Sequence, residues 1–140
     1  MIEVIKTKSY EKEAAFVNIK GAIYNPINYQ QQSFTLKCRV DTGFDGGILV
    51  PYEFYSDIQI IGIQPLIRQW TLADGEKKTV YICAAYIHSI DSYEFGAPGK
   101  PVKFVIPIGN KEIKLIGMNL LKYFITTFNG QNKNFSVIIA

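Results

Sequence analysis

Residues 39–51 read Arg39-Val40-Asp41-Thr42-Gly43-Phe44-Asp45-Gly46-Gly47-Ile48-Leu49-Val50-Pro51. A β-prone run, Phe34 to Val40, leads into the acid Asp41, and a second apolar run follows the last glycine. The glycines between the two runs allow a sharp loop, because residues without a Cβ tolerate positive φ. Asp41 is therefore predicted at the end of a buried strand, where Thr42 and free loop amides surround its carboxylate. Such an environment shifts a pKa and aims a carboxylate at a ligand, although Asp-Thr-Gly also occurs in ordinary turns.

The composition describes a folded, soluble chain. With 140 residues we predict a single domain over 1–140, in which residues 1–13 form an N-terminal arm or an edge strand. A content of 48% hydrophobic and 19% charged residues excludes a disordered chain. The net charge is +3, and the lysines are scattered among Glu and Asp. This favours a solvated surface over a nucleic-acid interface, which would cluster its cations, so no nucleic-acid partner is expected.

The cysteines and the single histidine argue against disulfide and metal chemistry. Cys38 and Cys83 lie in apolar segments with no signal peptide after Met1, so we expect reduced, buried thiols and a cytoplasmic location. His88 has no Cys or acid at ligand spacing, so neither a metal nor another cofactor is expected. Nothing marks a serine as its catalytic companion, and no P-loop is present. No apolar run approaches the ~20 residues that a membrane span needs, so no membrane partner is expected.

Outside the Asp41 loop, the pattern is mostly that of strands. A glutamine-rich patch at residues 30–32 predicts a turn, and Pro51 to Ser56 predicts a short helical turn. A loop is expected over Ser89 to Gly99. Alternation or β-prone composition predicts strands over Ala14–Tyr24, Phe34–Val40, Pro101–Ile108 and Glu112–Ile116, and a terminal hairpin over Ile125–Ile139.

A hairpin is also predicted between the two halves of the chain. Asp74-Gly75 lies between two β-rich runs within Gln69 to Cys83, and Asp-Gly is a strong hairpin signal. Ordinary turn chemistry is sufficient to explain this segment when it is taken alone.

A second motif reads Leu115-Ile116-Gly117-Met118-Asn119-Leu120-Leu121-Lys122-Tyr123-Phe124. Two apolar residues and a glycine precede a predicted short amphipathic helix, in which Leu120, Leu121 and Phe124 share one face. A strand, a glycine and a helix in succession are common in many folds, so this motif is informative only together with the first.

The two motifs, in this order and with a hairpin between them, resemble the retropepsin-like (clan AA) aspartic proteases. Retropepsins carry two hydrophobic residues and Gly-Arg-Asn-Leu-Leu at the second motif, and their glycine lets the strand pass beneath the catalytic loop. The chain looks most similar to the small single-domain prokaryotic members, whose loop also reads Asp-Thr-Gly-Phe. The resemblance spans Ala14 to Ile139 and implies an all-β fold, a closed retropepsin-like β-barrel (the acid protease fold) with one short C-terminal helix and one lobe per chain.

The resemblance also implies a mechanism and its residues. Each chain has one Asp-Thr-Gly, so a C2 homodimer would bring two Asp41 carboxylates together around one water and hydrolyse a peptide or protein substrate. Thr42 would anchor the loop across the interface, and Gly43 would give the backbone room. The substrate would contact Phe44 and Asp45 in the loop and the hairpin tip, which would close over it. The tip residues are Leu72, Ala73, Asp74 and Gly75, and the structural residues of the second motif are Gly117 and Asn119.

Three positions depart from the family pattern. Phe44 stands where retropepsins have alanine, so its ring either fills the subsite beside Asp41 or restricts it to small side chains. Met118 replaces the arginine that pairs with the acid at position 45, which leaves Asp45 exposed or paired with another donor such as Arg39 or Arg68. The hairpin tip, residues 73–75, is more polar than the glycine-rich tip of retropepsins.

These departures keep two other hypotheses open. One is a catalytically silent retropepsin-fold module for dimerisation or peptide binding, with a cleft narrowed by Phe44. The other is an unrelated small β-barrel in which Asp-Thr-Gly occurs by chance.

Overall fold

The structure is a computed structural model that describes residues 3–9, 14–41, 43–71, 75–109, 113–122, 124–129, 131 and 133–139; over 3–8, 124–129 and 134–139 it describes the backbone alone. The helical segments are the 3₁₀ turn η1 (Tyr52–Phe54), α1 (Tyr55–Ile60) and α2 (Met118–Leu121). The strands are β1 (Glu3–Ser9), β2 (Phe16–Tyr24), β3 (Gln31–Val40), β4 (Ile48–Leu49), β5 (Leu66–Thr71), β6 (Lys77–Ile90), β7 (Tyr93–Glu94), β8 (Lys100–Pro107), β9 (Leu115–Ile116), β10 (Phe124–Asn129) and β11 (Asn134–Ile139).

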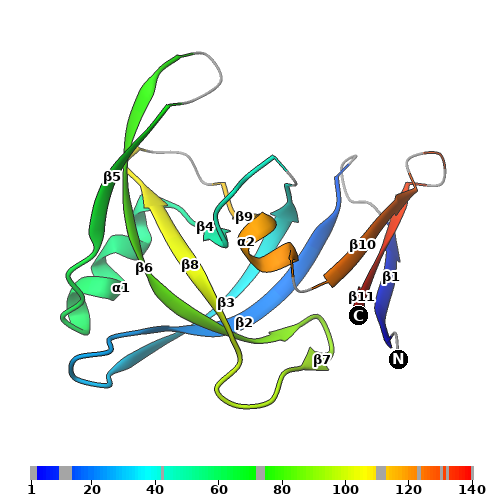
Figure 1. The fold of residues 1–140 in the computed structure, drawn as a ribbon, viewed down its shortest axis with the longest axis horizontal. Coiled ribbons are helices and arrows are strands. Elements are labelled where there is room, and N and C mark those ends of the chain that lie inside the picture. Colours follow the sequence, from blue (N-terminus) through cyan, green and yellow to red (C-terminus); the bar gives the residue numbers. More distant parts are fainter. Residues whose placement is uncertain are drawn as a thin grey trace.

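Six of these strands close a barrel in the order β2-β3-β9-β4-β8-β6, because β2 pairs with β6 as well as with β3 (Figure 1). The pairs β3–β9 and β4–β8 are parallel, and the other pairs of the barrel are antiparallel. The expected all-β class and closed barrel are confirmed. Beside the expected C-terminal helix α2, the barrel carries α1 on its outside.

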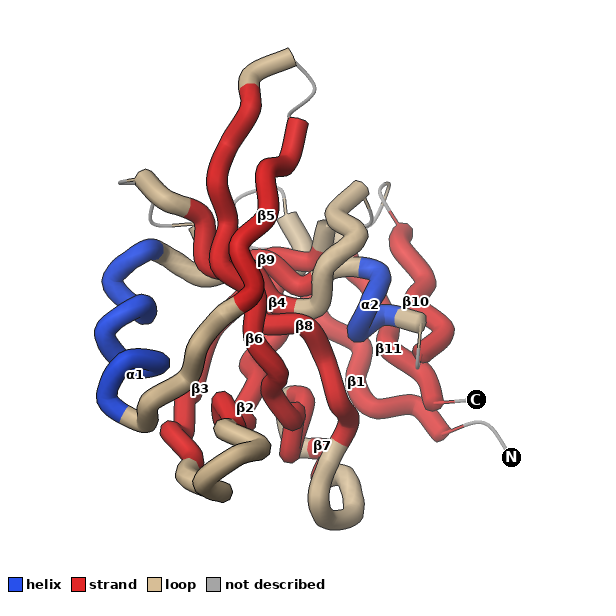
Figure 2. The backbone as a smooth tube through the Cα atoms, turned by 60° about the vertical axis from the view of Figure 1, so that its left-hand side comes forward, coloured by secondary structure: helices blue, strands red, loops and turns tan. Residues whose placement is uncertain are grey.

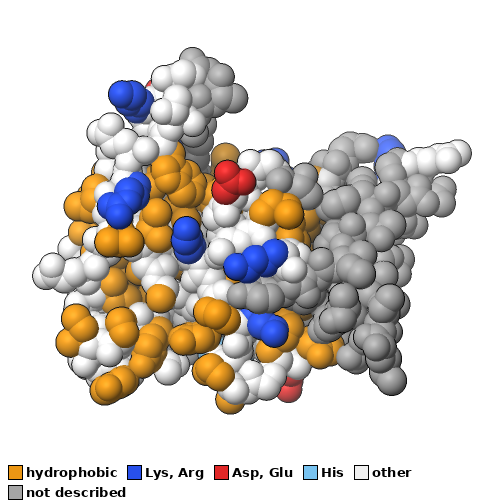
Figure 3. Space-filling model, viewed as in Figure 1, with side chains coloured by type: hydrophobic (Ala, Val, Ile, Leu, Met, Phe, Trp, Pro, Cys, Tyr) orange, Lys and Arg blue, Asp and Glu red, His pale blue; other side chains and the backbone are white. Residues whose placement is uncertain are grey.

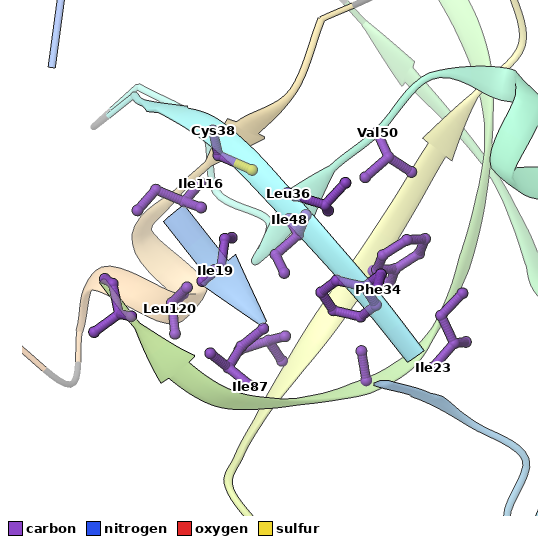
Figure 4. Packing of buried hydrophobic residues seen from close by; sticks show 14 of the residues in the cluster. Ile19, Ile23, Phe34, Leu36, Cys38, Ile48, Val50, Ile87, Ile116 and Leu120 are labelled. Atoms are coloured by element: carbon purple, nitrogen blue, oxygen red, sulfur yellow. The ribbon is translucent and has the colours of Figure 1, made fainter. Parts of the chain in front are cut away.

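The barrel interior is filled by alternate residues of its strands. On β3, Phe34, Leu36 and Cys38 are buried, whereas Thr35 and Lys37 between them are exposed. This is the half-buried alternation that the sequence predicted. Figure 4 shows side chains of β2, β3, β4 and β6 meeting Leu120 of α2 in one apolar core.

The segment after the Asp41 loop is more helical than predicted. The expected turn over Pro51 to Ser56 is present as η1, and α1 continues it to Ile60 with Ile58 fully buried. Asn25, a buried polar residue just after β2, donates from Nδ2 to the carbonyl oxygen of Ile61 at 2.7 Å. This bond fixes the end of α1 to the β2–β3 turn, because a buried amide without its partner would be costly.

A separate sheet holds the chain ends. β11 pairs with β10 on one side and with β1 on the other, all antiparallel, and this sheet lies beside the barrel at the α2 end (Figure 1). The predicted terminal hairpin is therefore confirmed. Of the two expectations for the N-terminal residues, the edge strand is correct for Glu3–Ser9.

Three predicted boundaries were wrong. β3 begins at Gln31, inside the glutamine-rich patch predicted as a turn, because Gln31 pairs with Tyr24 of β2. Phe124 does not lie on the helix face, since α2 ends at Leu121 and Phe124 begins β10 opposite Ile139. The segment predicted as a loop after residue 88 contains the end of β6 and its partner β7.

None of the helices in the described ranges has the length and apolar composition that a membrane span requires.

Both cysteines are free thiols: Cys38 on β3 is fully buried, and Cys83 on β6 is half-buried. Burial raises the pKa of the Cys38 thiol from 9.0 to about 12, with a smaller opposing effect of Lys114. Burial also raises the pKa of Cys83 to about 12. Neither thiol is therefore activated as a nucleophile at neutral pH.

The raised pKa of Cys38 predicts how the free energy of unfolding depends on alkaline pH. An unfolded Cys38 loses its proton near pH 9, whereas the folded protein keeps it to about pH 12, so stability falls as the pH rises between these values. The contribution of this thiol is at most about 1.4 kcal/mol per pH unit. We expect the stability difference between the wild type and Cys38→Ala, measured by chemical denaturation, to narrow from about pH 8 to about pH 10.5. A difference that stays constant over this range would contradict the prediction.

Candidate active site

Asp41 follows β3 directly, at the end of the barrel from which the β5–β6 hairpin rises (Figures 1 and 2). Its amide donates to the carbonyl oxygen of Ile116 at 2.9 Å, which joins the loop to β9. Its half-buried carboxylate accepts one hydrogen bond at Oδ1, from the amide of Gly43 at 2.9 Å, and the Phe44 amide donates to its carbonyl oxygen at 3.2 Å. Thr42, the expected loop anchor, lies outside the described residues. The backbone thus fixes Asp41 on both sides.

The second motif crosses this loop and binds it through backbone hydrogen bonds. The amide of Gly117 donates to the carbonyl oxygen of Gly47 at 3.0 Å. The amide of Met118 donates to the carbonyl oxygen of Phe44 at 2.8 Å, and the amide of Asn119 donates to that of Gly46 at 3.1 Å. Residues seventy or more positions apart in the sequence are joined here by backbone hydrogen bonds.

Side chains extend this unit into the barrel. Asn119 accepts a hydrogen bond at Oδ1 from the Lys103 amide of β8 at 2.8 Å. The Asp41 loop, the start of α2 and β8 are therefore held together by hydrogen bonds.

The crossing leaves no space for a side chain at position 117. A Cβ added to Gly117 would lie 2.3 Å from the carbonyl oxygen of Phe44, 2.5 Å from Cδ2 of its ring and 2.7 Å from the carbonyl oxygen of Gly46. Two of these atoms belong to the backbone of the loop, which cannot move without displacing the segment after Asp41. This close approach is the physical reason for a glycine here.

The Phe44 ring turns inward and is 8% exposed. It packs with Val80, Val105 and Leu115 in a small apolar cluster, and its centroid lies 5.8 Å from that of Trp70 on β5. The ring therefore occupies the space between the loop and the base of the hairpin.

Asp45 and Met118 are both exposed. Within the described part of the chain, neither Arg39 nor Arg68 forms an ion pair with Asp45, and Arg68 donates instead to the carbonyl oxygen of Ile67. Of the outcomes left open for Asp45, exposure is the one observed. A solvated carboxylate needs no replacement for the family arginine.

The predicted hairpin is present as β5 and β6, with Leu66 opposite Ile82 and Thr71 opposite Lys77. Gly75 is exposed with a φ of +84°, a conformation that favours glycine. The remaining tip residues of the prediction, Leu72, Ala73 and Asp74, lie outside the described residues.

A metal-ligand cluster or a cavity elsewhere in the described chain could also mark a site. No group of three or more His, Cys, Asp or Glu in the described ranges is placed to hold a metal ion. A cavity of about 570 Å³ lies between Tyr24, Tyr86, His88 and the loop at residues 95–99. Asp41 does not line it, and it contains no carboxylate, because it opens near the start of β3 while Asp41 follows the end of that strand.

The sequence did not indicate a role for Trp70. It was placed in the hairpin, but its contact with Phe44 depends on the pairing of β5 with β6 and on the inward turn of the ring. The available signal was a lone large aromatic residue in a strand end that is otherwise polar, Arg68 to Thr71.

Comparison with known proteins shows the fold. No protein-family model and no curated protein matches the chain. Among solved structures, it is similar to a retropepsin-like aspartic protease from Rickettsia conorii, with a TM-score of 0.53 and 19% sequence identity over 99% of this chain and 93% of that chain. The chain therefore has a retropepsin-like fold.

The crossing at Gly117 predicts a severe effect of a single methyl group. Gly117→Ala should destabilise the protein by about 1–3 kcal/mol or more, because the methyl would overlap backbone atoms of the loop. The matched control is Gly96→Ala, since a Cβ at Gly96 meets nothing within 4 Å. The control should change stability by no more than about 1 kcal/mol in the same denaturant titration. Equal losses of stability in the two variants would contradict the close packing described at Gly117.

Proposed function

We propose that this chain is an aspartic endopeptidase that acts as a homodimer, with residues 1–140 forming one retropepsin-like domain. The observation that carries the proposal is the placement of Asp41. Its carboxylate accepts a hydrogen bond from the Gly43 amide, which orients it. The loop that carries Asp41 packs closely against the backbone at Gly117. A retropepsin-like fold with an oriented carboxylate at this end of the barrel supports peptide hydrolysis as the activity.

One carboxylate is insufficient for this chemistry. A two-fold axis near the loop would bring Asp41 of each protomer together, since a C2 interface repeats the same surface on both subunits. Two carboxyl groups about 3 Å apart share one proton, because both cannot ionise easily at that distance. Homodimerisation is therefore part of the proposal.

The proposed reaction uses the two states of this pair. The ionised Asp41 takes a proton from a water held between the carboxylates, and the resulting nucleophile attacks the peptide carbonyl. The protonated Asp41 donates to the carbonyl oxygen, and a proton then passes to the departing amine. In each chain, Oδ1 is fixed by Gly43, and Oδ2 accepts no hydrogen bond from any described residue, which leaves it available to the water.

The β5–β6 hairpin is proposed to close over the substrate and exclude water. It rises at the Asp41 end of the barrel (Figure 2). The Trp70 ring on β5 contacts the Phe44 ring of the loop. The same contact favours a second candidate function, a dimerisation or peptide-binding module without turnover, because Phe44 takes up space between the loop and the hairpin.

Replacement of one side chain separates these functions. We expect the wild type to cleave an unfolded protein or a peptide library between about pH 3 and 7, where paired aspartates titrate. Asp41→Asn should lower cleavage by at least about 100-fold, because an amide cannot exchange the proton. Cleavage is measured by mass spectrometry, the fold by circular dichroism, and the dimer by sedimentation equilibrium.

Asp57→Asn is the matched control, since it makes the same chemical change on α1, outside the loop, and should leave cleavage unchanged. The protease proposal fails if the folded wild-type dimer cleaves nothing in this pH range, or if Asp41→Asn cleaves as fast as the wild type. A folded, inactive dimer would support the silent module.

A further inference from the structure

The cavity of about 570 Å³ lies at the end of the barrel away from the Asp41 loop. Its lining comes from the end of β2, the start of β3, the middle of β6 and the loop at residues 95–99. That loop joins β7 to β8 and lies at the opposite end of the molecule from the β5–β6 hairpin (Figures 1 and 2). Gln31 lines the cavity at the start of β3, and about 30 Å of extended strand separates it from Asp41. This cavity is therefore a separate candidate site.

Three aromatic residues line the cavity: Tyr24 at the end of β2, Tyr86 on β6 and Phe95 in the loop. On β6, Tyr86 alternates with Ala85 and Ile87, which are buried in the core, so its side chain leaves the barrel on the outer face. Its ring lies edge-on to that of Tyr24, with centroids 5.8 Å apart. Both tyrosines are half-buried and lie outside the two core clusters. These two rings therefore offer the cavity flat apolar surfaces that the core does not use.

The loop that closes the cavity is fixed against β6. The amide of Phe95 donates to the carbonyl oxygen of His88 at 2.8 Å. Gly99 has a φ of +102° and lies so close to β6 that an added Cβ would overlap the carbonyl oxygen of Ile87. The fold itself therefore forms the cavity, as is usual for sites that bind small molecules.

Four polar side chains also line the cavity: Tyr24 and Tyr86 through their hydroxyls, Gln31 through its amide and His88 through its imidazole. Each of these groups can donate and accept hydrogen bonds. None of them forms a side-chain hydrogen bond with another described residue. The described lining residues include no Lys, Arg, Asp or Glu. Hydrophobic and other uncharged side chains also predominate at the lower end of the face drawn in Figure 3.

The size and chemistry of the lining define the ligand. A volume of about 570 Å³ lies within the roughly 300–1,000 Å³ of sites that enclose a small molecule. Aromatic walls favour a flat ring, which can stack on them. Several groups that both donate and accept favour a ring with both kinds of polar atom on its edge. A phosphate or carboxylate would find no Lys or Arg among the described lining residues and would lose hydration without compensation.

We propose that this cavity binds an uncharged, flat nitrogen heterocycle of nucleobase or nucleoside size. The Tyr24 and Tyr86 rings contact the heterocycle, and Gln31 and His88 form hydrogen bonds with the polar atoms on its edge. The cavity shares no described lining residue with the Asp41 loop, so this proposal does not depend on peptide hydrolysis.

The test is a titration of the full chain with adenosine, guanosine, cytidine and uridine, followed by proton–nitrogen NMR correlation spectra. We expect at least one nucleoside to bind with a Kd between about 10 µM and 1 mM, the range that its size predicts. The amides of Tyr86, His88, Phe95 and Gly99 should shift most. Ribose, which lacks the base, should cause no shifts. Adenosine monophosphate should bind no tighter than adenosine, because the described lining offers its phosphate no cation.

Two pairs of variants assign the binding to the cavity. Tyr86→Leu removes the ring and should weaken binding by about 5- to 100-fold, the effect of losing one stacked aromatic side chain. Its control is Tyr52→Leu, the same change at an exposed tyrosine of η1 outside the lining, which should bind as the wild type does. Gln31→Ala should weaken binding by about 3- to 10-fold, whereas Gln59→Ala on α1 should not. Because Gln31 is exposed, its variant tests the site even if Tyr86→Leu alters the fold.

Three results would overturn the proposal. The first is that none of the four nucleosides binds at concentrations up to a few millimolar, or that the shifts centre on residues 43–47 instead. The second is adenosine monophosphate binding more than about 10-fold tighter than adenosine, which would indicate a charged ligand. The third is binding that both Tyr86→Leu and Gln31→Ala leave unchanged. Peptide cleavage is measured separately, so these results leave the protease proposal as it stands.

Discussion

The crossing of two backbone segments at Gly117 is the constraint on which the rest of the structure depends. The loop after Asp41 has no strand partner of its own, yet its carbonyl oxygens at Phe44, Gly46 and Gly47 all accept amides from residues 117–119. Buried backbone groups without partners would be costly, so this pairing allows a polar loop to close the end of an apolar barrel. Ile48 and Ile116, which flank the crossing, are fully buried and anchor it in the core.

Phe44 shows how one large residue is accommodated at a crowded turn. Its ring lies against Gly46, where an added Cβ would be 2.3 Å from Cζ, and against Gly117, so two glycines make room for one aromatic side chain. The contact between the Phe44 and Trp70 rings then links the loop to the hairpin. The Phe44 ring fills the space between the Asp41 loop and β5. The hairpin base and the carboxylate loop consequently share one apolar cluster, and a displacement of either is transmitted to the other.

The sequence predicted the parts of the fold that depend on local pattern. Alternation was sufficient to predict β3, whereas the crossing of the two motifs was expected only from their resemblance to the retropepsins. The errors arose where distant pairing overrides local preference: Gln31 is in a strand because Tyr24 lies opposite, and Phe124 leaves the helix because Ile139 pairs with it. For the same reason, the contact between Phe44 and Trp70 could not be predicted from spacing, since it depends on the pairing of β5 with β6.

The described contacts of residue 41 use the shape of its side chain but not its charge. An asparagine could accept the same hydrogen bond from Gly43, and the backbone bonds to Ile116 and Phe44 would be unaffected. The described contacts therefore do not require a carboxylate at position 41, and this agrees with the proposed role of Asp41 in proton transfer.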